Sequence, residues 1–250
     1  MGGITLDEMN AVKLMNRIDA KYVTNEATLQ RMLSAAAAAG YRVLETEGAR
    51  ISPYDSVYYD TAGLTMFYLH HNRRLVRQKV RTRQYVNSGD SFLEIKRKNN
   101  HGRTKKKRIP IEESEMMEFA GNAEACAYLA RHSWFTVGEI SPILSTAFKR
   151  ITLVNPNRTE RLTIDTSLFF QNFQTGRKAS LEDAVIIELK QDGHADSQMK
   201  KILLSNRVKP VRISKYCLAE TLTDPSVKKN RFKVKVRTVE KTINKKIQVI

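Results

Sequence analysis

The sequence predicts an α+β protein whose strands form a closed antiparallel β-barrel tunnel, with helices packed outside it. Three observations favour this fold class. Strand-like segments outnumber helical ones and follow one another across short turns, as hairpins do. Several strands alternate apolar residues with charged residues, which puts the charges on one face. A sheet with so highly charged a face is better accommodated as a barrel with a water-filled or ligand-filled interior.

The first elements follow from alternation and capping. Residues 17–22 alternate polar and apolar residues and are predicted to form a strand. Thr24 or Asn25 can cap a helix over residues 26–39, which contains a run of alanines. Residues 56–61 are predicted as the next strand, followed by a short helical piece.

Three basic strands come next, over residues 75–85, 92–98 and 103–111. Odd-numbered positions of the first strand place four cations on one face: Arg77, Lys79, Arg81 and Arg83. Like charges on one face repel each other, so a fold tolerates them only where solvent or a polyanion neutralises them.

The second and third basic strands extend this charged face. Glu94 and Lys96 share one face of the second strand, while Leu93 and Ile95 share the other. In the third strand three lysines are consecutive, and we choose Lys106 and Arg108 as the pair that shares the inward face. Glu94 is expected either to form an ion pair with Lys96 or Arg81 or to bind a metal.

The remaining elements alternate between helices and strands. They are a helix over 112–130, strands over 143–154, 161–165 and 185–190, a helix over 196–205 and a last core strand over 211–217. The three amphipathic helices would cover the apolar outer face of the barrel. Residues 1–223 are predicted as the tunnel domain and residues 224–250 as a basic tail, either a solvated or membrane-surface arm or an extra strand.

Composition restricts the classes of partner. The 250-residue chain has a net charge of +17, which points to a polyanion. A nucleic acid is not expected, because aromatic residues are not interleaved with the basic strands as base stacking requires. The chain has no Walker A sequence, no Cys or His cluster with metal-ligand spacing and no Gly-rich dinucleotide loop.

Composition also predicts where the protein resides. Two cysteines, Cys126 and Cys217, cannot form a disulfide framework, which fits a reduced compartment. We find neither a signal-peptide pattern in residues 1–16 nor eighteen consecutive apolar residues. We therefore expect a cytoplasmic location. Peripheral attachment through the basic tail, to an anionic membrane surface or to a membrane protein partner, stays open.

Short motifs in a fixed order run from Arg17 to Glu220. They are Arg17-x-x-x-Lys21-Tyr22, Tyr58-Tyr59-Asp60-Thr61, Arg81-x-Arg83-x-Tyr85, Phe92-x-Glu94-Ile95-Lys96, Ile187-Glu188-Leu189-Lys190 and Ser214-Lys215-Tyr216. Together they resemble the VTC domain, the polyphosphate polymerase module of the triphosphate tunnel (CYTH-like) metalloenzyme superfamily.

The resemblance implies an ATP–polyphosphate phosphotransferase, in which the γ-phosphoryl group of ATP moves onto a growing inorganic polyphosphate chain inside a basic tunnel. The residues that it places at the reacting phosphates are Arg81, Arg83, Lys96, Arg150, Arg161 and Lys215. Those that it places along the substrate are Lys21, Lys106, Arg108, Lys190, Arg212 and Ser214. ATP and inorganic polyphosphate would be the substrates.

The resemblance also implies a divalent metal, manganese with magnesium as the alternative, held by Glu188. The physical chemistry agrees, because arginine forks bind phosphate oxygens bidentately and a hard cation prefers carboxylate oxygens. A structural ion pair of Glu188 with Lys190 or Arg161 is the other interpretation of this carboxylate. Two other functions stay open: a hydrolase that acts on triphosphate or a nucleotide in a similar tunnel, and a non-catalytic polyphosphate-binding module.

Overall fold

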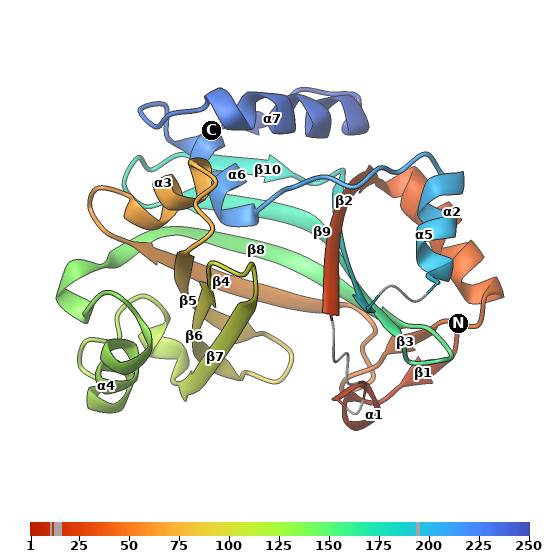
Figure 1. Ribbon diagram of the computed structural model, residues 1–250, viewed down its shortest axis with the longest axis horizontal. Helices are drawn as coiled ribbons and strands as arrows, with labels where there is room; N and C mark the ends of the chain where they lie inside the picture. The colour runs from red at the N-terminus through yellow and green to blue at the C-terminus, as the bar shows by residue number, and fades with distance from the viewer. Residues whose placement is uncertain (11, 13–16, 194–195) are drawn as a thin grey trace.

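The computed structural model describes residues 1–10, 12, 17–193 and 196–250. Figure 1 shows a curved antiparallel sheet with helices around it. The strands are β1 (Gly3–Ile4), β2 (Arg17–Asn25), β3 (Arg42–Leu44), β4 (Ser52–Asp60), β5 (Arg77–Tyr85), β6 (Ser91–Lys98), β7 (Thr104–Ile111), β8 (Ser141–Val154), β9 (Glu160–Asn172), β10 (Lys178–Leu181), β11 (Ala184–Asp192) and β12 (Gln248–Val249).

The helices lie between and after these strands. They are α1 (Leu6–Asn10), α2 (Glu26–Ala38), α3 (Thr65–His71), α4 (Ala123–His132), α5 (Gln198–Ser205), α6 (Lys215–Thr223) and α7 (Asn230–Ile243), with 3-10 turns η1 (Glu113–Met116) and η2 (Val137–Glu139). Within the described residues, no helix is both long enough and apolar enough to cross a bilayer.

The wall of the tunnel is a continuous path of antiparallel pairs in the order β2-β11-β9-β8-β4-β5-β6-β7. The later part of β9 also pairs with β10, which pairs with β12, and β3 adds to β8. Among the described strands, the one parallel pair is the short β1–β3 contact. This register sets which residues face the interior, since side chains alternate along every strand.

The predicted α+β barrel with outer helices is confirmed, with one difference in its closure. In the described part of the chain, β2 and β7 form no ladder of hydrogen bonds, so a seam remains between the two ends of the path. β7 is a lysine-rich strand with mostly exposed side chains. Lysines on an edge strand discourage further pairing, which explains physically why the sheet curls without closing here.

Two groups of helices cover the outer face, as the amphipathic patterns predicted. The α2 and α5 helices lie side by side over β2, β9 and β11 (Figure 1), where Met32 and Leu203 join the same buried cluster as Ile187 and Leu189. On the other side, α4 through Leu129 and η1 through Met116 join a buried cluster with residues of β4, β5 and β6. The side-chain oxygen of Asn25 caps α2, as one of the two predicted alternatives.

The α6 helix lies in the molecule's largest core cluster, and seven of its nine residues are buried. Tyr216, Leu218 and their neighbours pack against Val23 and Ile186, which share strand faces with Lys21 and Glu188. The interior of the barrel is therefore divided into an apolar part that α6 fills and a charged part beside it.

Two predicted elements differ from the structure. Residues 112–130 form η1 and α4 instead of one helix, because Asn122 caps a new helix by accepting a hydrogen bond from Ala125 N. Residues 211–217 do not form a strand. Ser214 accepts from the amide of Cys217 and starts α6 at Lys215, so the apolar alternation there was misleading.

The expectation of a solvated arm or an extra strand at the C-terminus is also wrong for residues 230–243. They form α7, which lies across the top of the view in Figure 1. Phe232 and Val239, seven residues apart on one helix face, are buried in the same cluster as α6. The helix thus packs on the barrel, while the domain boundary at residue 223 stays a prediction.

Candidate anion-binding tunnel

The charged part of the interior is organised around three carboxylates, Glu94, Asp165 and Glu188, each of which lies beside two cations. They come from β6, β9 and β11, whose alternation turns these positions inward. Nine-tenths or more of the side chains of Glu94 and Asp165 is removed from solvent, whereas Glu188 keeps 20% of its side-chain surface exposed.

Glu94 holds one cation on each oxygen. Arg81 donates from Nε and Nη2 to Oε2 at 2.8 and 2.6 Å, and Lys106 donates to Oε1 at 2.7 Å. Burial alone would raise the pKa of Glu94, but these two cations and Arg83 outweigh it and hold the pKa well below its usual range. The carboxylate is therefore ionised and fixes Arg81 in the tunnel wall.

Asp165 forms a second such centre. The guanidinium of Arg150, opposite it in the β8–β9 ladder, donates to both oxygens at 2.6 and 2.8 Å. Lys215, the first residue of α6, bonds to Oδ2 and lies over the ring of Phe148. Burial opposes ionisation, yet Arg150 and Lys215 keep the pKa of Asp165 well below its usual range.

Glu188 differs from these two carboxylates because its cation contacts are long. Lys21 lies 3.4 Å and Lys190 lies 3.9 Å from its oxygens. Burial would raise the pKa of Glu188, but Lys21, Lys190 and Lys96 lower it well below its usual value. An ionised carboxylate without a short ion pair can accept a further cation.

Arg83 is the most buried of the arginines and lysines that were predicted to bind phosphate. Its Nε donates to Ser56 Oγ at 2.9 Å, and its guanidinium lies 5.5 and 5.6 Å from the ring centres of Tyr54 and Phe148. Burial and the neighbouring Arg81 lower its pKa to about 10, at which it remains charged at neutral pH. Among the described residues, no carboxylate lies within ion-pair distance of Arg83, so its guanidinium offers donors to an anion.

Three lysines at this site have a pKa below the usual value for lysine. Burial is the main cause that lowers the pKa of Lys96, Lys190 and Lys215, each to about 8. Lys96 is itself exposed, whereas Lys190 and Lys215 expose less than a fifth of their side chains, so burial best explains the lowered pKa of these two. A bound anion would favour their charged forms.

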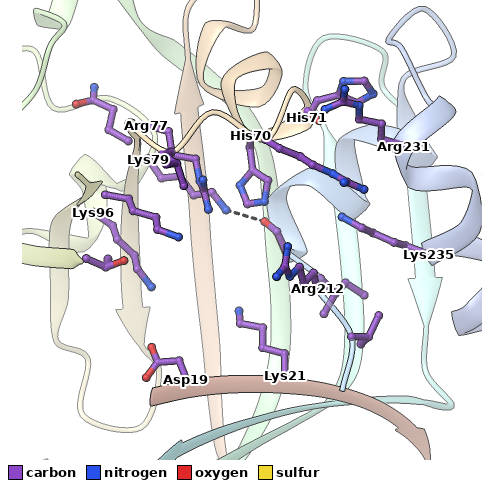
Figure 2. A pocket seen from close by; sticks show the side chains of 18 residues that line it. Asp19, Lys21, His70, His71, Arg77, Lys79, Lys96, Arg212, Arg231 and Lys235 are labelled. Atoms are coloured by element: carbon purple, nitrogen blue, oxygen red, sulfur yellow. Dashed lines mark hydrogen bonds between the residues drawn. The ribbon is translucent and has the colours of Figure 1, made fainter. Parts of the chain in front are cut away.

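One end of the charged space widens into a cavity of about 550 Å³, which we call the vestibule. It lies at the seam of the barrel and is lined by Asp19 and Lys21 of β2 and Thr104 of β7, with residues of β5 and β6 and of the segment before α6. Figure 2 shows that the labelled side chains converge on this common space. Four of the predicted residues lie here: Lys21, Lys96, Arg212 and Ser214.

The remaining predicted residues lie further along the wall. Arg161 faces Lys190 in the β9–β11 ladder. Arg108 shares the Glu94 face, as chosen from the sequence, but it is exposed, donates to Tyr85 Oη at 3.3 Å and covers the ring of Phe92. Most of the predicted set thus converges on one charged space, with Arg108 at its outer rim.

Tyr58 and Lys79 also lie at the site, although neither is among the residues that the resemblance places at the phosphates or along the substrate. Arg81 Nη1 donates to Tyr58 Oη at 3.1 Å, and Lys79 donates to Ser214 Oγ at 2.6 Å. Burial would raise the pKa of Tyr58, but Arg81, Arg83 and other cations lower it to about 7. The alternation in β5 placed Lys79 on the charged face, whereas Tyr58 stands in one of the quoted motifs but has no charge that would have marked it as a site residue.

The donor set at Glu188 fits a hard divalent cation that takes most of its ligands from the phosphates of the bound substrate. Within the described residues, no three Asp, Glu, His or Cys side chains converge as a metal cage. One ionised carboxylate with loose ammonium contacts can supply one ligand, and phosphate oxygens and water would have to supply the rest. Magnesium and manganese bound with phosphates are commonly held this way.

Comparison with known protein families matches residues 16–223 to the model of the VTC domain. The chain belongs to the VTC domain family. The matched part includes all of the charged wall described above and ends with α6, so α7 lies outside it. A comparison with curated proteins finds no match to this VTC domain chain.

Two solved structures have the same fold. A putative adenylyl cyclase of Hippeastrum, described as having a dominant triphosphatase activity, is 12% identical with a TM-score of 0.55, covering 82% of this chain and 95% of its own. A putative adenylate cyclase of Bacillus halodurans is 13% identical with a TM-score of 0.51, covering 80% and 94%. At such low identity these similarities show only the triphosphate tunnel fold.

Proposed function

We propose that this VTC domain is an ATP–polyphosphate phosphotransferase that moves the γ-phosphoryl group of ATP onto an inorganic polyphosphate chain. The observation that carries the proposal is the contrast between the three tunnel carboxylates. Glu94 and Asp165 are held by short ion pairs that fix arginines in the wall, whereas Glu188 keeps only long contacts. The wall thus combines positioned phosphate ligands with one carboxylate ready for a metal ion.

The cations would bind and align the phosphates. Arg81 and Arg150 are pre-oriented by their carboxylates, and Arg83 by Ser56, so little side-chain entropy is lost when an anion arrives. Phosphoryl transfer depends mainly on positioning and on neutralisation of charge, which is what such a wall supplies.

Glu188 would hold the divalent metal, manganese or magnesium. The metal, when bound, would neutralise charge on the phosphate oxygens as a Lewis acid. Lys21 and Lys190 would stay beside the same carboxylate and turn their ammonium groups to the phosphates.

The transfer needs no protein nucleophile and no proton. An oxygen of the terminal phosphate of the acceptor chain would attack the γ-phosphorus of ATP. The bond between that phosphorus and the oxygen bridging to the β-phosphate would break, and ADP would leave with the electron pair. The side chains would hold the two phosphates in line and exclude water from the reacting position.

Hydrolysis of triphosphate or of a nucleotide is the second candidate. It is favoured by one observation, the triphosphatase activity described for the Hippeastrum protein of the same fold. The same wall could position water in place of the acceptor phosphate. A binding module without turnover is the third alternative.

Incubation of the purified protein with ATP and Mn²⁺, followed by a gel that resolves polyphosphate by length, separates these functions. A ladder of polymer with ADP supports the phosphotransferase. Orthophosphate without polymer favours the hydrolase, and tight tripolyphosphate binding without turnover favours the binding module. Either of the last two results overturns the proposal.

A further inference from the structure

The vestibule is charged in a different way from the centre of the tunnel. Its lining contains nine lysines and arginines and a single carboxylate, Asp19. In the described part of the chain, Lys21 is the one cation of these nine within ion-pair distance of a carboxylate, Glu188. So many cations around one space repel each other, and the repulsion is relieved when a polyanion enters.

Two of these cations come from α7, outside the matched VTC domain. Arg231 and Lys235 are four residues apart and therefore lie on one face of the helix, which turns them to the vestibule (Figure 2). Arg231 Nη1 lies 3.4 Å from the backbone oxygen of His71, and Lys235 Nζ lies 4.0 Å from the ring centre of Phe232. Both side chains are thus anchored at their positions.

The anchor of α7 is the buried Phe232, which stacks on Phe67 and His71 of α3. This packing places the helix beside the cavity, and the charged residues next to Phe232 follow from helical spacing. Burial lowers the pKa of Lys235, and the cations Arg73, Arg212 and Lys79 lower it further. These are the charges that a polyanion in the cavity would neutralise.

We propose that the vestibule is a second phosphate-binding subsite, which binds the segment of a polyphosphate chain that extends beyond the tunnel centre, with Arg231 and Lys235 of α7 among its ligands. The proposal rests on the phosphotransferase function above and adds two ligands, Arg231 and Lys235, that lie outside the family's domain. It makes α7 part of the substrate path and not only a structural support.

The chemistry of the lining favours a phosphate chain over a nucleotide base. The aromatic side chains that line the vestibule in the described part of the chain are His70 and His71, with no Phe, Tyr or Trp, and His71 is buried against Phe67 and Phe232. A base stacks best on a large, open aromatic face, whereas a phosphate chain needs cations alone. Lys79 and Lys96, which lie in both the vestibule and the β5–β6 wall, connect the two regions.

The proposal is tested by calorimetry with two ligands, tripolyphosphate and long-chain polyphosphate. Each ligand is titrated into the unmodified protein, the Lys235→Ala variant and the Arg231→Ala variant. Each variant should bind the long chain about tenfold more weakly, as expected for one charge-assisted contact, with a much smaller loss for tripolyphosphate. Lys233→Ala is the matched control, since Lys233 is an exposed residue of the same helix that does not line the vestibule. Thermal unfolding checks that each variant is folded.

The outcomes separate this inference from the proposed function. Equal losses for the short and the long chain, or a loss in Lys233→Ala as large as in Lys235→Ala, would overturn the vestibule subsite. A Lys235→Arg variant that restores long-chain binding would support it, because charge and reach are kept. If tripolyphosphate does not bind to the unmodified protein at all, the tunnel function itself fails.

Discussion

Arg81 and Glu94 face each other across the β5–β6 ladder, and the guanidinium donates twice to one carboxylate oxygen. The second oxygen of Glu94 accepts from Lys106 of β7. One buried carboxylate therefore joins three neighbouring strands through their inward cations. It also fixes Arg81 against the hydroxyl of Tyr58.

Replacement of this carboxylate should destabilise the fold. Glu94→Gln leaves Arg81 without its counter-charge in a partly buried position, and we expect a loss of about 3 kcal/mol in the free energy of unfolding. Added tripolyphosphate should recover part of the loss, because it supplies the missing negative charge. Urea unfolding with and without tripolyphosphate measures both effects.

A surface pair provides the control for this variant. Glu45 lies 3.0 Å from Arg50, and both side chains are largely exposed. Glu45→Gln should change the free energy of unfolding by no more than about 1 kcal/mol, with no response to tripolyphosphate. Equal losses in the two variants would contradict the role given to Glu94.

The metal assignment predicts a specific effect of Glu188→Gln. Mn²⁺ affinity in the presence of tripolyphosphate should fall by at least about tenfold. Even mutation of residues that only hydrogen-bond to a metal ligand commonly lowers metal affinity by that factor. Binding of tripolyphosphate without metal should persist. Electron paramagnetic resonance of free Mn²⁺ reports the first quantity and calorimetry the second. If Asp19→Asn lowered the Mn²⁺ affinity and Glu188→Gln did not, the metal ligand would be Asp19 of β2 and not Glu188.

Phosphate affinity should depend on pH in a range unusual for lysine. The pKa values of Lys190 and Lys215 are lowered to about 8, so both ammonium groups lose their protons as the pH rises through that value. Tripolyphosphate affinity should fall between about pH 7 and about pH 9, far below the ordinary pKa of lysine. Binding at the upper end should take up protons, because the anion restores the charged forms. Calorimetry in buffers of different ionisation enthalpy detects this uptake, and a flat profile would contradict it.

Tyr58 offers an optical test of the charge in the tunnel. Its pKa is lowered to about 7, so the empty protein should show phenolate absorbance that rises near neutral pH. Tyr58→Phe should remove this transition, and tripolyphosphate should shift it to higher pH by screening Arg81 and its neighbours. Tyr54→Phe is the control, because burial raises the pKa of Tyr54 and no neutral-pH signal should be lost. A transition that survives in Tyr58→Phe would refute the assignment.

The part of the site that lies on regular strands was predictable from the sequence. Alternation alone puts Arg81 with Arg83 and Glu94 with Lys96 on shared faces, whatever the rest of the chain does. The register between strands was not predictable, and so Lys96 and Arg81 both stayed open as the ion-pair partner of Glu94. The structure has Arg81 and Lys106, because β7 lies beside β6 in a register that brings Lys106 to that carboxylate.

The C-terminal elements show why local patterns failed there. Val211 and Ile213 alternate like a strand, but the hydroxyl of Ser214 caps a helix that is then buried by contacts from many elements. In α7, Phe232, Val234 and Val236 alternate with cations as a strand would, yet Val234 is 69% exposed and Phe232 is buried. The packing of Phe232 against the barrel favours the helix over a strand, and the local alternation of residue types carries no information about that packing.

The central claim is tested most directly with ATP labelled in its γ-phosphate, incubated with the protein, Mn²⁺ and unlabelled short polyphosphate. The account predicts that the label appears in longer polyphosphate, and that ATP labelled in its α-phosphate yields labelled ADP and no labelled polymer. If the γ-label appears only as orthophosphate, or stays in ATP while tripolyphosphate binds tightly, this VTC domain is not a polyphosphate polymerase.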